Sequence, residues 1–235
     1  MAAVDAELRR RATPGRAEME KAYLKSTLEH LGTAVADVRA AMRPVVRRPD
    51  LDHDGLVDLA LGLWEPPIHE RRLAAVELLR GRADLLTGGD LPLLEELVRE
   101  ARTWALVDVL AASVVGPIVE HDPAAAGVLD RWVTDEDVWV RRAALLALLV
   151  PLRAGRGDWE RFARYADAML DEREFFIRKA SGWVLRDTGR RRPDLVHAWL
   201  LPRSARASGV TWREAVKPLT DEQRAELERA RSAGG

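Results

Sequence analysis

Residues 174–186 read Glu-Phe-Phe-Ile-Arg-Lys-Ala-Ser-Gly-Trp-Val-Leu-Arg, and this stretch decides the class of fold. Phe176, Ala180 and Trp183 recur at helical spacing and fall on one stripe of an α-helix, together with Lys179. Gly182 inside such a helix costs about 1 kcal/mol relative to alanine. Two interpretations fit this glycine: tight packing against the next helix, or a flat platform formed by Trp183 beside open space.

The same helical periodicity extends outward over almost the whole chain, and no segment shows a sustained alternation of β-branched residues. One or two helices are predicted over residues 18–42. Further helices are predicted over 55–64, 68–80, 91–101, 103–115, 123–132, 135–150, 158–171, 173–188, 193–201 and 211–217. Gly116-Pro117 is expected to end the helix over 103–115. Short helices with short connectors predict an all-α fold, an α-solenoid of HEAT-like helix pairs with a concave face that can hold a long polymer.

The domain organisation follows from the same pattern. Residues 18–219 are predicted to form a single domain. Residues 1–17 are expected to be a lead that is either a short helix or disordered, and residues 220–235 a charged helical tail that frays.

Composition bounds the class of protein. The chain has 235 residues, of which 47% are hydrophobic and 32% charged, a mixture typical of a folded domain. There is no cysteine, no signal-peptide pattern and no apolar run that predicts a membrane span. We therefore expect a cytoplasmic, bacterial-type protein. The net charge of −1 is low for a DNA-binding domain, so the distribution of cations matters more than their sum.

One carboxylate occupies an unusual position. Asp108 interrupts the apolar run Ala105–Ala112, and Trp104 lies one helical turn before it on the same face. An aspartate in this setting caps a neighbouring helix or pairs with an arginine in most proteins. The alternative is a functional carboxylate held beside an aromatic wall.

Two adjacent arginines are also notable. Arg141 and Arg142 lie in a helix that continues as an apolar run, and their side chains leave it about 100° apart. One of them must therefore lean towards the apolar side. Either an ion pair between helices or a clamp for a phosphate group would explain this placement.

Taken together, these segments resemble the AlkD family of DNA alkylation-repair glycosylases. The segment 174–186 is similar to the family's EFFIxKAxGWxLR motif. Trp104-x-x-x-Asp108, Trp139-Val-Arg-Arg142 with the Ala-Ala-Leu-Leu that follows, and the helix Trp212–Lys217 agree in the same order. Residues 19–25 resemble the family's first helix more loosely, so the resemblance covers residues 18–219.

The resemblance implies that the concave face binds DNA, and it implies roles for individual residues. It makes Asp108 the catalytic carboxylate, Trp104 and Trp183 the aromatic walls of the lesion cleft, and Arg142 the contact to the backbone phosphate at the lesion. Further phosphate contacts are expected from cations in or beside the matched segments, namely Arg141, Arg178, Lys179, Arg213 and Lys217. No metal ligand is expected, because the five histidines are scattered without metal-binding spacing.

The function implied is that of a monofunctional glycosylase without a cofactor. Such an enzyme, acting as a monomer, would hydrolyse the glycosidic bond of N3-alkyladenine, N7-alkylguanine and bulkier cationic adducts in double-stranded DNA, without flipping the base. Two alternatives stay open: a non-catalytic HEAT-like scaffold that binds DNA or protein, and a metal-dependent hydrolase. The sequence also leaves open whether the role is general repair or self-resistance to an alkylating natural product.

Overall fold

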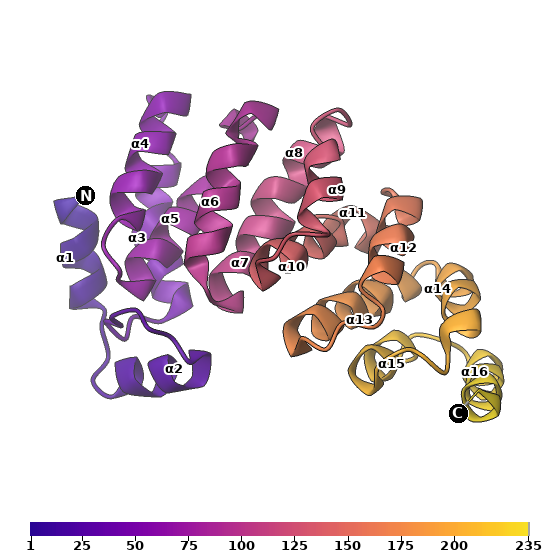
Figure 1. Cartoon of the computed structure of the whole chain (residues 1–235). Coiled ribbons are helices and arrows are strands. Elements are labelled where there is room, and N and C mark those ends of the chain that lie inside the picture. The colour runs from indigo at the N-terminus through magenta and orange to yellow at the C-terminus, as the bar shows by residue number, and fades with distance from the viewer. Residues whose placement is uncertain (235) are drawn as a thin grey trace. The chain divides into compact units, whose positions relative to one another are not determined.

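The computed structural model describes residues 1–234, and these are helical apart from connecting segments and one isolated β-bridge between Glu29 and Ile68. The chain divides into two compact units, Met1–Val114 (unit 1) and Val115–Gly235 (unit 2), which Figure 1 shows as successive sets of helices from indigo to yellow. The predicted all-α fold with HEAT-like helix pairs is confirmed. The concave DNA-binding face stays a prediction.

Unit 1 is organised around one central helix. Its α-helices are α1 (Ala2–Arg10), α2 (Arg16–Leu24), α3 (Val35–Val46), α4 (His53–Trp64), α5 (His69–Gly81), α6 (Leu91–Ala101) and α7 (Trp104–Leu110). Helix α5 packs against α3, α4 and α7, and α6 packs against α7. Every residue of α5 from Leu73 to Leu79 is buried, because the helix has neighbours on several sides. Helix α2 differs from the rest, since none of its residues is buried.

Unit 2 repeats this plan around α13. Its α-helices are α8 (Gly116–His121), α9 (Gly127–Trp132), α10 (Val138–Leu146), α11 (Leu149–Arg153), α12 (Trp159–Ala168), α13 (Phe175–Gly189), α14 (Pro193–Leu200), α15 (Gly209–Ala215) and α16 (Asp221–Ala233). Helix α13 packs against α10, α11, α14 and α15. It contains the 174–186 motif almost entirely, so that motif forms the centre of unit 2.

Of the one or two helices predicted over 18–42, the structure shows two, separated by a non-helical segment. Helix α2 ends at Leu24, Lys25 adopts a left-handed conformation with φ 49°, and α3 begins only at Val35. The intervening segment is held by long-range backbone hydrogen bonds: Glu29 N donates to the Pro67 carbonyl at 2.9 Å, and His69 N donates to the Glu29 carbonyl at 2.8 Å. Helical spacing in the sequence does not reveal such partners.

Gly116-Pro117 does not end the predicted helix over 103–115. A π-helical turn, Ala111–Val115, follows α7, and α8 starts at Gly116 with Pro117 in its first turn. Proline lacks the N–H that an α-helical interior needs, and a wider turn before it relieves the clash with the preceding carbonyl. As a result, Trp104–His121 forms 18 helical residues with a mean hydropathy of 1.4.

This span corrects the expectation that no segment is long and apolar enough to cross a membrane. By length and composition alone Trp104–His121 passes that test, but 56% of it is buried within the protein. A buried core helix passes the same test, so the span is weak support for a membrane segment.

Both terminal segments contain a helix: α1 lies within the predicted lead, residues 1–17, and α16 lies within the predicted tail, residues 220–235. In α1, Leu8 is fully buried and its carbonyl accepts a hydrogen bond from Thr33 Oγ1 at 2.8 Å. In α16, Leu227 is fully buried, and the helix starts with a capping box formed by Thr220 and Gln223. The domain boundaries at 18 and 219 stay predictions.

Candidate functional site

Helix α7 in unit 1 presents Trp104 and Asp108 on its open side. Leu106, Val107 and Leu110 are buried, whereas Trp104 and Asp108 are partly exposed. Thr103 caps the helix, its Oγ1 accepting from the Ala105 N–H at 3.4 Å. The helix therefore anchors itself with its apolar face and leaves an indole and a carboxylate accessible, one turn apart, as the spacing predicts.

Trp104 is accompanied by a second aromatic ring and a basic pocket. Tyr23 of α2 meets it edge-on with ring centroids 6.0 Å apart. A pocket of about 360 Å³ next to α7 is lined by residues that include Lys25, Arg72 and Arg102. Lys25 and Arg102 both adopt left-handed backbone conformations, with φ 49° and 46°. Such strain persists only where the surroundings enforce it, and here it directs attention to two cations beside Trp104.

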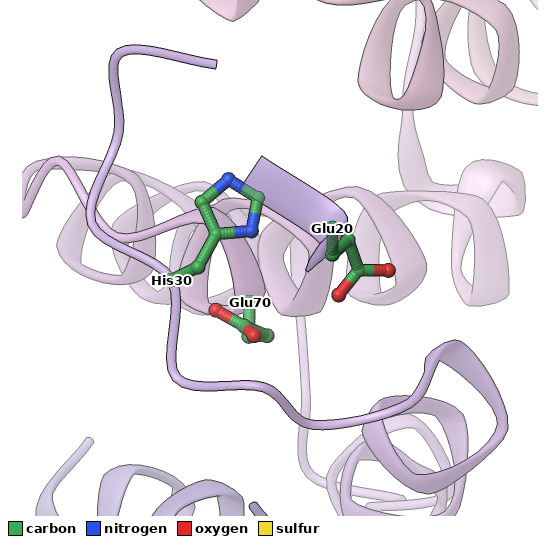
Figure 2. Close-up of side chains that lie close together, drawn as sticks. All are labelled: Glu20, His30 and Glu70. Carbon is green, nitrogen blue, oxygen red and sulfur yellow. The ribbon is translucent and has the colours of Figure 1, made fainter. Parts of the chain in front are cut away.

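A separate group of ionisable side chains lies in the same unit (Figure 2). Glu20 of α2, His30 of the connecting segment and Glu70 of α5 offer ligand atoms that all lie within 4.8 Å of one another. Among the described residues this is the one group of histidines and carboxylates that could hold a metal ion. It contains none of the residues that the sequence singled out.

In unit 2, α10 carries the two arginines in different environments. Arg142 is buried with 3% of its surface exposed, donates to the Phe176 carbonyl, and stacks over the Phe176 ring at 5.8 Å. Arg141 donates to the carbonyls of Asp135 and Glu136 at 2.7 and 2.8 Å and to Glu172 Oε2 at 2.9 Å. Arg141 thus holds the start of its own helix and pairs with the segment that precedes α13.

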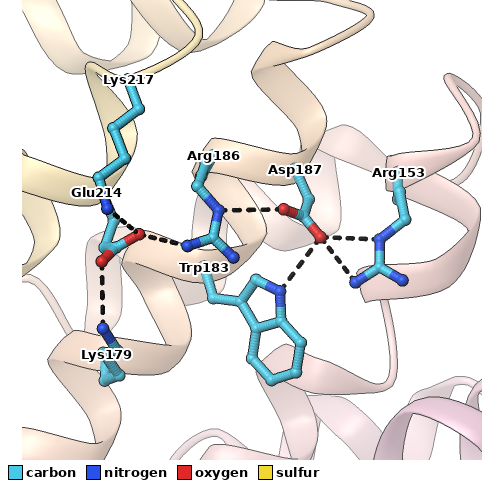
Figure 3. Close-up of polar contacts among 7 residues, drawn as sticks. All are labelled: Arg153, Lys179, Trp183, Arg186, Asp187, Glu214 and Lys217. Carbon is cyan, nitrogen blue, oxygen red and sulfur yellow. Dashed lines mark hydrogen bonds and ion pairs between the residues drawn. The ribbon is translucent and has the colours of Figure 1, made fainter.

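Trp183 of α13 is fixed through its indole N–H (Figure 3). Trp183 Nε1 donates to Asp187 Oδ2 at 3.1 Å. Asp187 is 3% exposed and also accepts from Arg153 Nε at 2.7 Å and Arg186 Nε at 3.2 Å. The carboxylate one turn after Trp183 therefore sets the orientation of the partly exposed indole ring, a role that the sequence analysis missed.

Two predicted phosphate contacts, Lys179 and Lys217, already pair with one carboxylate. Glu214 of α15 pairs with Lys179 at 3.1 Å, with Lys217 at 3.0 Å and with Arg186. Burial raises the pKa of Glu214, but its bonds to Lys217, Lys179 and Arg186 outweigh burial and lower the pKa to about 2. Glu214 is thus ionised, and a DNA phosphate would have to compete with it for these cations.

Arg178 and Arg213, two other predicted phosphate contacts, differ in whether they have a hydrogen-bond partner within the protein. Arg178 Nε donates to the Glu172 carbonyl at 2.6 Å, so it helps to fix the segment before α13. Arg213 is exposed and has no hydrogen-bond or ion-pair partner among the described residues. Of the predicted phosphate contacts, Arg213 is therefore the most readily available to an anion.

Gly182 is explained by packing. A Cβ atom at this position would lie 2.9 Å from Glu214 Cβ and 3.2 Å from the backbone of Thr211. Thr211 Oγ1 also donates to the Arg178 carbonyl at 3.2 Å, which joins α15 to α13. The interpretation as tight packing against another helix is confirmed, and α15 is that helix.

With this geometry established, the relatives of the chain can be identified. Residues 4–219 match the family described as DNA alkylation repair enzyme. The chain belongs to this family. The match confirms the resemblance that the motifs carried and implies binding to DNA. Comparison with curated proteins found no match.

Solved structures show the same fold at low sequence identity. One is described as a predicted DNA alkylation repair enzyme from Enterococcus faecalis, with 20% identity, a TM-score of 0.78, and coverage of 90% of this chain and 98% of that one. Another is AlkD2 from Streptococcus mutans, with 19% identity, a TM-score of 0.62, and coverage of 86% and 99%. A third, smu.31 from Streptococcus mutans UA159, has 19% identity, a TM-score of 0.61, and coverage of 79% and 98%.

Some features of this DNA alkylation repair enzyme could have been found from sequence and others not. Asp187 follows Trp183 by one helical turn, so its spacing was a usable signal. Lys25 and Arg102 lie beside segments that were singled out, but only the structure shows that both line one pocket and that both have left-handed backbone conformations. Glu214 was part of a matched segment, yet two of its cationic partners, Lys179 and Arg186, come from α13, and only Lys217 lies close to it in the sequence.

Proposed function

We propose that this DNA alkylation repair enzyme is a monofunctional DNA glycosylase that releases cationic N3-alkyladenine and N7-alkylguanine bases from duplex DNA. The observation that carries the proposal is the exposed face of α7. There Trp104 and Asp108 stand one turn apart and partly exposed, while Leu106, Val107 and Leu110 of the same helix are buried.

These residue types suit the chemistry of an alkylated purine. The base carries a formal positive charge, so when the bond between C1′ and the base nitrogen breaks, its electron pair neutralises the base. The sugar becomes oxocarbenium-like, and a carboxylate such as Asp108 stabilises that cation and orients the water that adds to C1′. The water's proton passes to Asp108 or to solvent. An indole face such as that of Trp104 attracts a cationic sugar.

Within unit 2, Trp183 is proposed as a further aromatic residue that contacts the lesion, and Arg142 and Arg213 are proposed as phosphate contacts. Asp187 supports this role for Trp183, because it holds the indole N–H at 3.1 Å. The proposed chemistry uses water and no cofactor, and the protein would act as a cytoplasmic monomer that joins the nucleoid when bound to DNA, without a membrane partner. Because catalysis takes place at the sugar, the base need not enter a pocket, and bulky adducts would be accepted.

The experiment that tests the proposal is release of 7-methylguanine from methylated duplex DNA in the presence of EDTA. Asp108→Asn should lower the rate by about 10²–10⁴-fold, whereas Asp58→Asn, at an exposed aspartate of α4, should not change it. Unchanged release by Asp108→Asn would refute the catalytic assignment. Release that EDTA abolishes at once would favour a metal-dependent hydrolase.

A parallel assay with a bulky N3-adenine adduct tests the absence of base flipping. Excision of both lesions supports catalysis without a base pocket. If 7-methylguanine is released while the bulky adduct stays untouched, a closed pocket is required instead. Binding to DNA without release of any lesion would favour the non-catalytic scaffold.

A further inference from the structure

His30 has buried polar atoms with no partner. Its surface is 9% exposed, and neither ring nitrogen has a hydrogen-bond partner in the structure. A buried unsatisfied polar group costs about 1–3 kcal/mol, so such groups usually have a bound partner. The ring cannot simply turn away, because it stacks on His69 with centroids 4.5 Å apart and planes inclined by 6°.

Two carboxylates lie beside this imidazole (Figure 2). Glu70 is fully buried and accepts backbone N–H bonds from Leu31, Gly32 and Thr33 at 2.9, 2.6 and 3.1 Å. These bonds fix the carboxylate in place and leave it further lone pairs. Glu20 comes from α2, and its Oε2 is buried and has no partner. Ligands that are oriented by surrounding backbone groups are a feature of protein metal sites.

The charge of this group favours a cation. Arg16 pairs with Glu20, with its Nη2 atom 3.5 Å from Glu20 Oε1. Burial lowers the pKa of the His30 imidazole, with smaller opposing effects of Glu70 and Glu20, so the ring is neutral and available as a ligand at neutral pH. Two carboxylates and a neutral imidazole together carry two negative charges in a partly buried site.

Helix α2 lacks any other strong anchor. None of its residues is buried, Tyr23 is 73% exposed, and Met19 is 69% exposed. An isolated helix of this length is unstable in water, so it depends on contacts to the rest of the protein. Glu20 is the residue of α2 whose carboxylate points towards His30 and Glu70.

We propose that Glu20, His30 and Glu70 bind one divalent transition-metal ion of the zinc class, which fastens α2 to the start of α5. Imidazole and carboxylate oxygens are ligands that zinc accepts, with bonds of about 2.0–2.2 Å and water in the fourth position. Ligand atoms of such a tetrahedron are about 3.4 Å apart, so ligand atoms that lie within 4.8 Å of one another must draw closer when the ion binds. The ion is structural, and the proposal does not depend on the glycosylase activity.

The test uses the full-length protein, stripped of metal with a chelator and then freed of the chelator. Titration calorimetry with Zn²⁺ should give one ion per chain, and Co²⁺ at the same site should give the visible absorption of a tetrahedral complex. At a hundredfold excess over its dissociation constant, Zn²⁺ should raise the melting temperature by about 5–10 °C.

Two variants identify the ligands. Glu20→Gln and His30→Phe should each weaken Zn²⁺ binding by at least about 100-fold and abolish the gain in melting temperature. Glu18→Gln, at an exposed glutamate of the same helix, should bind like the wild type. Glu20→Gln removes a partly buried charge, so its metal-free form should melt at or above the wild-type temperature, which shows that it folds.

Either of two results would overturn the proposal. If the wild-type chain binds neither Zn²⁺ nor Co²⁺, the group holds water or protons instead. If Glu20→Gln binds Zn²⁺ as tightly as the wild type does, the ion lies elsewhere on the protein.

Discussion

In unit 1 the buried carboxylate Glu70 lies beside His30, whose ring nitrogens lack partners, whereas in unit 2 the buried carboxylates Asp187 and Glu214 are each surrounded by cations. Glu70 lies on α5 and Asp187 lies on α13, which are the central helices of the two units, and Glu214 lies on α15, which packs against α13. The difference separates two uses of buried charge. A network in which the buried charges have partners fixes the side chains that belong to it, and we call the network around Asp187 and Glu214 the saturated group. A group with unpartnered polar atoms, such as that of His30, is a place where an ion or a proton can bind.

The largest effect that this comparison predicts is a difference in acid sensitivity. Burial, followed by the charge of His30, lowers the pKa of His69 to about 4. An unfolded histidine has a pKa near 6.5, so the unfolded chain takes up a proton first. Stability from neutral His69 is therefore complete above about pH 6.5 and is lost as the pH falls towards 4. The loss at pH 4 is at most about 3 kcal/mol.

Glu214 behaves in the opposite way, since its folded pKa of about 2 lies below the unfolded value. Its contribution is present above about pH 4.5 and is lost only as the pH falls towards 2. Urea unfolding of the metal-stripped protein from pH 7 to 4 should show the early loss, His69→Phe should remove most of it, and His121→Gln should leave it unchanged. An equal loss in His69→Phe would contradict this assignment.

The next effect concerns the saturated group. Asp187→Ala removes the acceptor of the Trp183 N–H and leaves Arg153 and Arg186 without this partner. Breaking a fully buried pair costs about 3–5 kcal/mol. Arg153 is 45% exposed and can be hydrated, so we expect a loss of about 2 kcal/mol in the free energy of unfolding.

Excision kinetics distinguish a positioning role of Asp187 from a purely structural one. Asp187→Ala should lower kcat by about 10–100-fold with little change in KM, because Trp183 loses its orientation. Asp187→Asn keeps an oxygen that can accept the indole N–H, so it should retain most of kcat while losing part of the stability. If both variants lose kcat equally, the charge of Asp187 matters and the hydrogen bond to Trp183 does not.

Local periodicity predicted those parts of the fold that depend on local contacts. The helix predicted over 91–101 coincides with α6, and the face shared by Trp104 and Asp108 is present on α7. The segment between α2 and α3 was assigned wrongly, because its backbone partners lie near Pro67 and His69, far away in the sequence.

The candidate site was predictable to the extent that its residues share one helix. Lys217 follows Glu214 by three residues, so their ion pair is local, whereas only the packing of α15 on α13 brings Glu214 to Lys179. The Glu20, His30 and Glu70 group has no recognisable spacing, because its members come from two helices and the segment that connects α2 to α3. Ion pairs and ligand groups whose members are far apart in the sequence are created by the fold, so a local sequence pattern does not reveal them.

The smallest predicted effect tests how tightly the saturated group is packed. Gly182→Ala places a methyl group 2.9 Å from Glu214 Cβ, so α15 and its carboxylate must move. Overpacking costs about 1–3 kcal/mol and the gain in helix propensity offsets about 1 kcal/mol, which leaves a net loss of about 1 kcal/mol. Gly127→Ala in α9 meets nothing within 4 Å and should stabilise the protein by a few tenths of a kcal/mol up to ~1 kcal/mol. Urea unfolding of the two variants should therefore shift in opposite directions, and a shared gain would mean that α15 yields easily and that its network holds α13 only loosely.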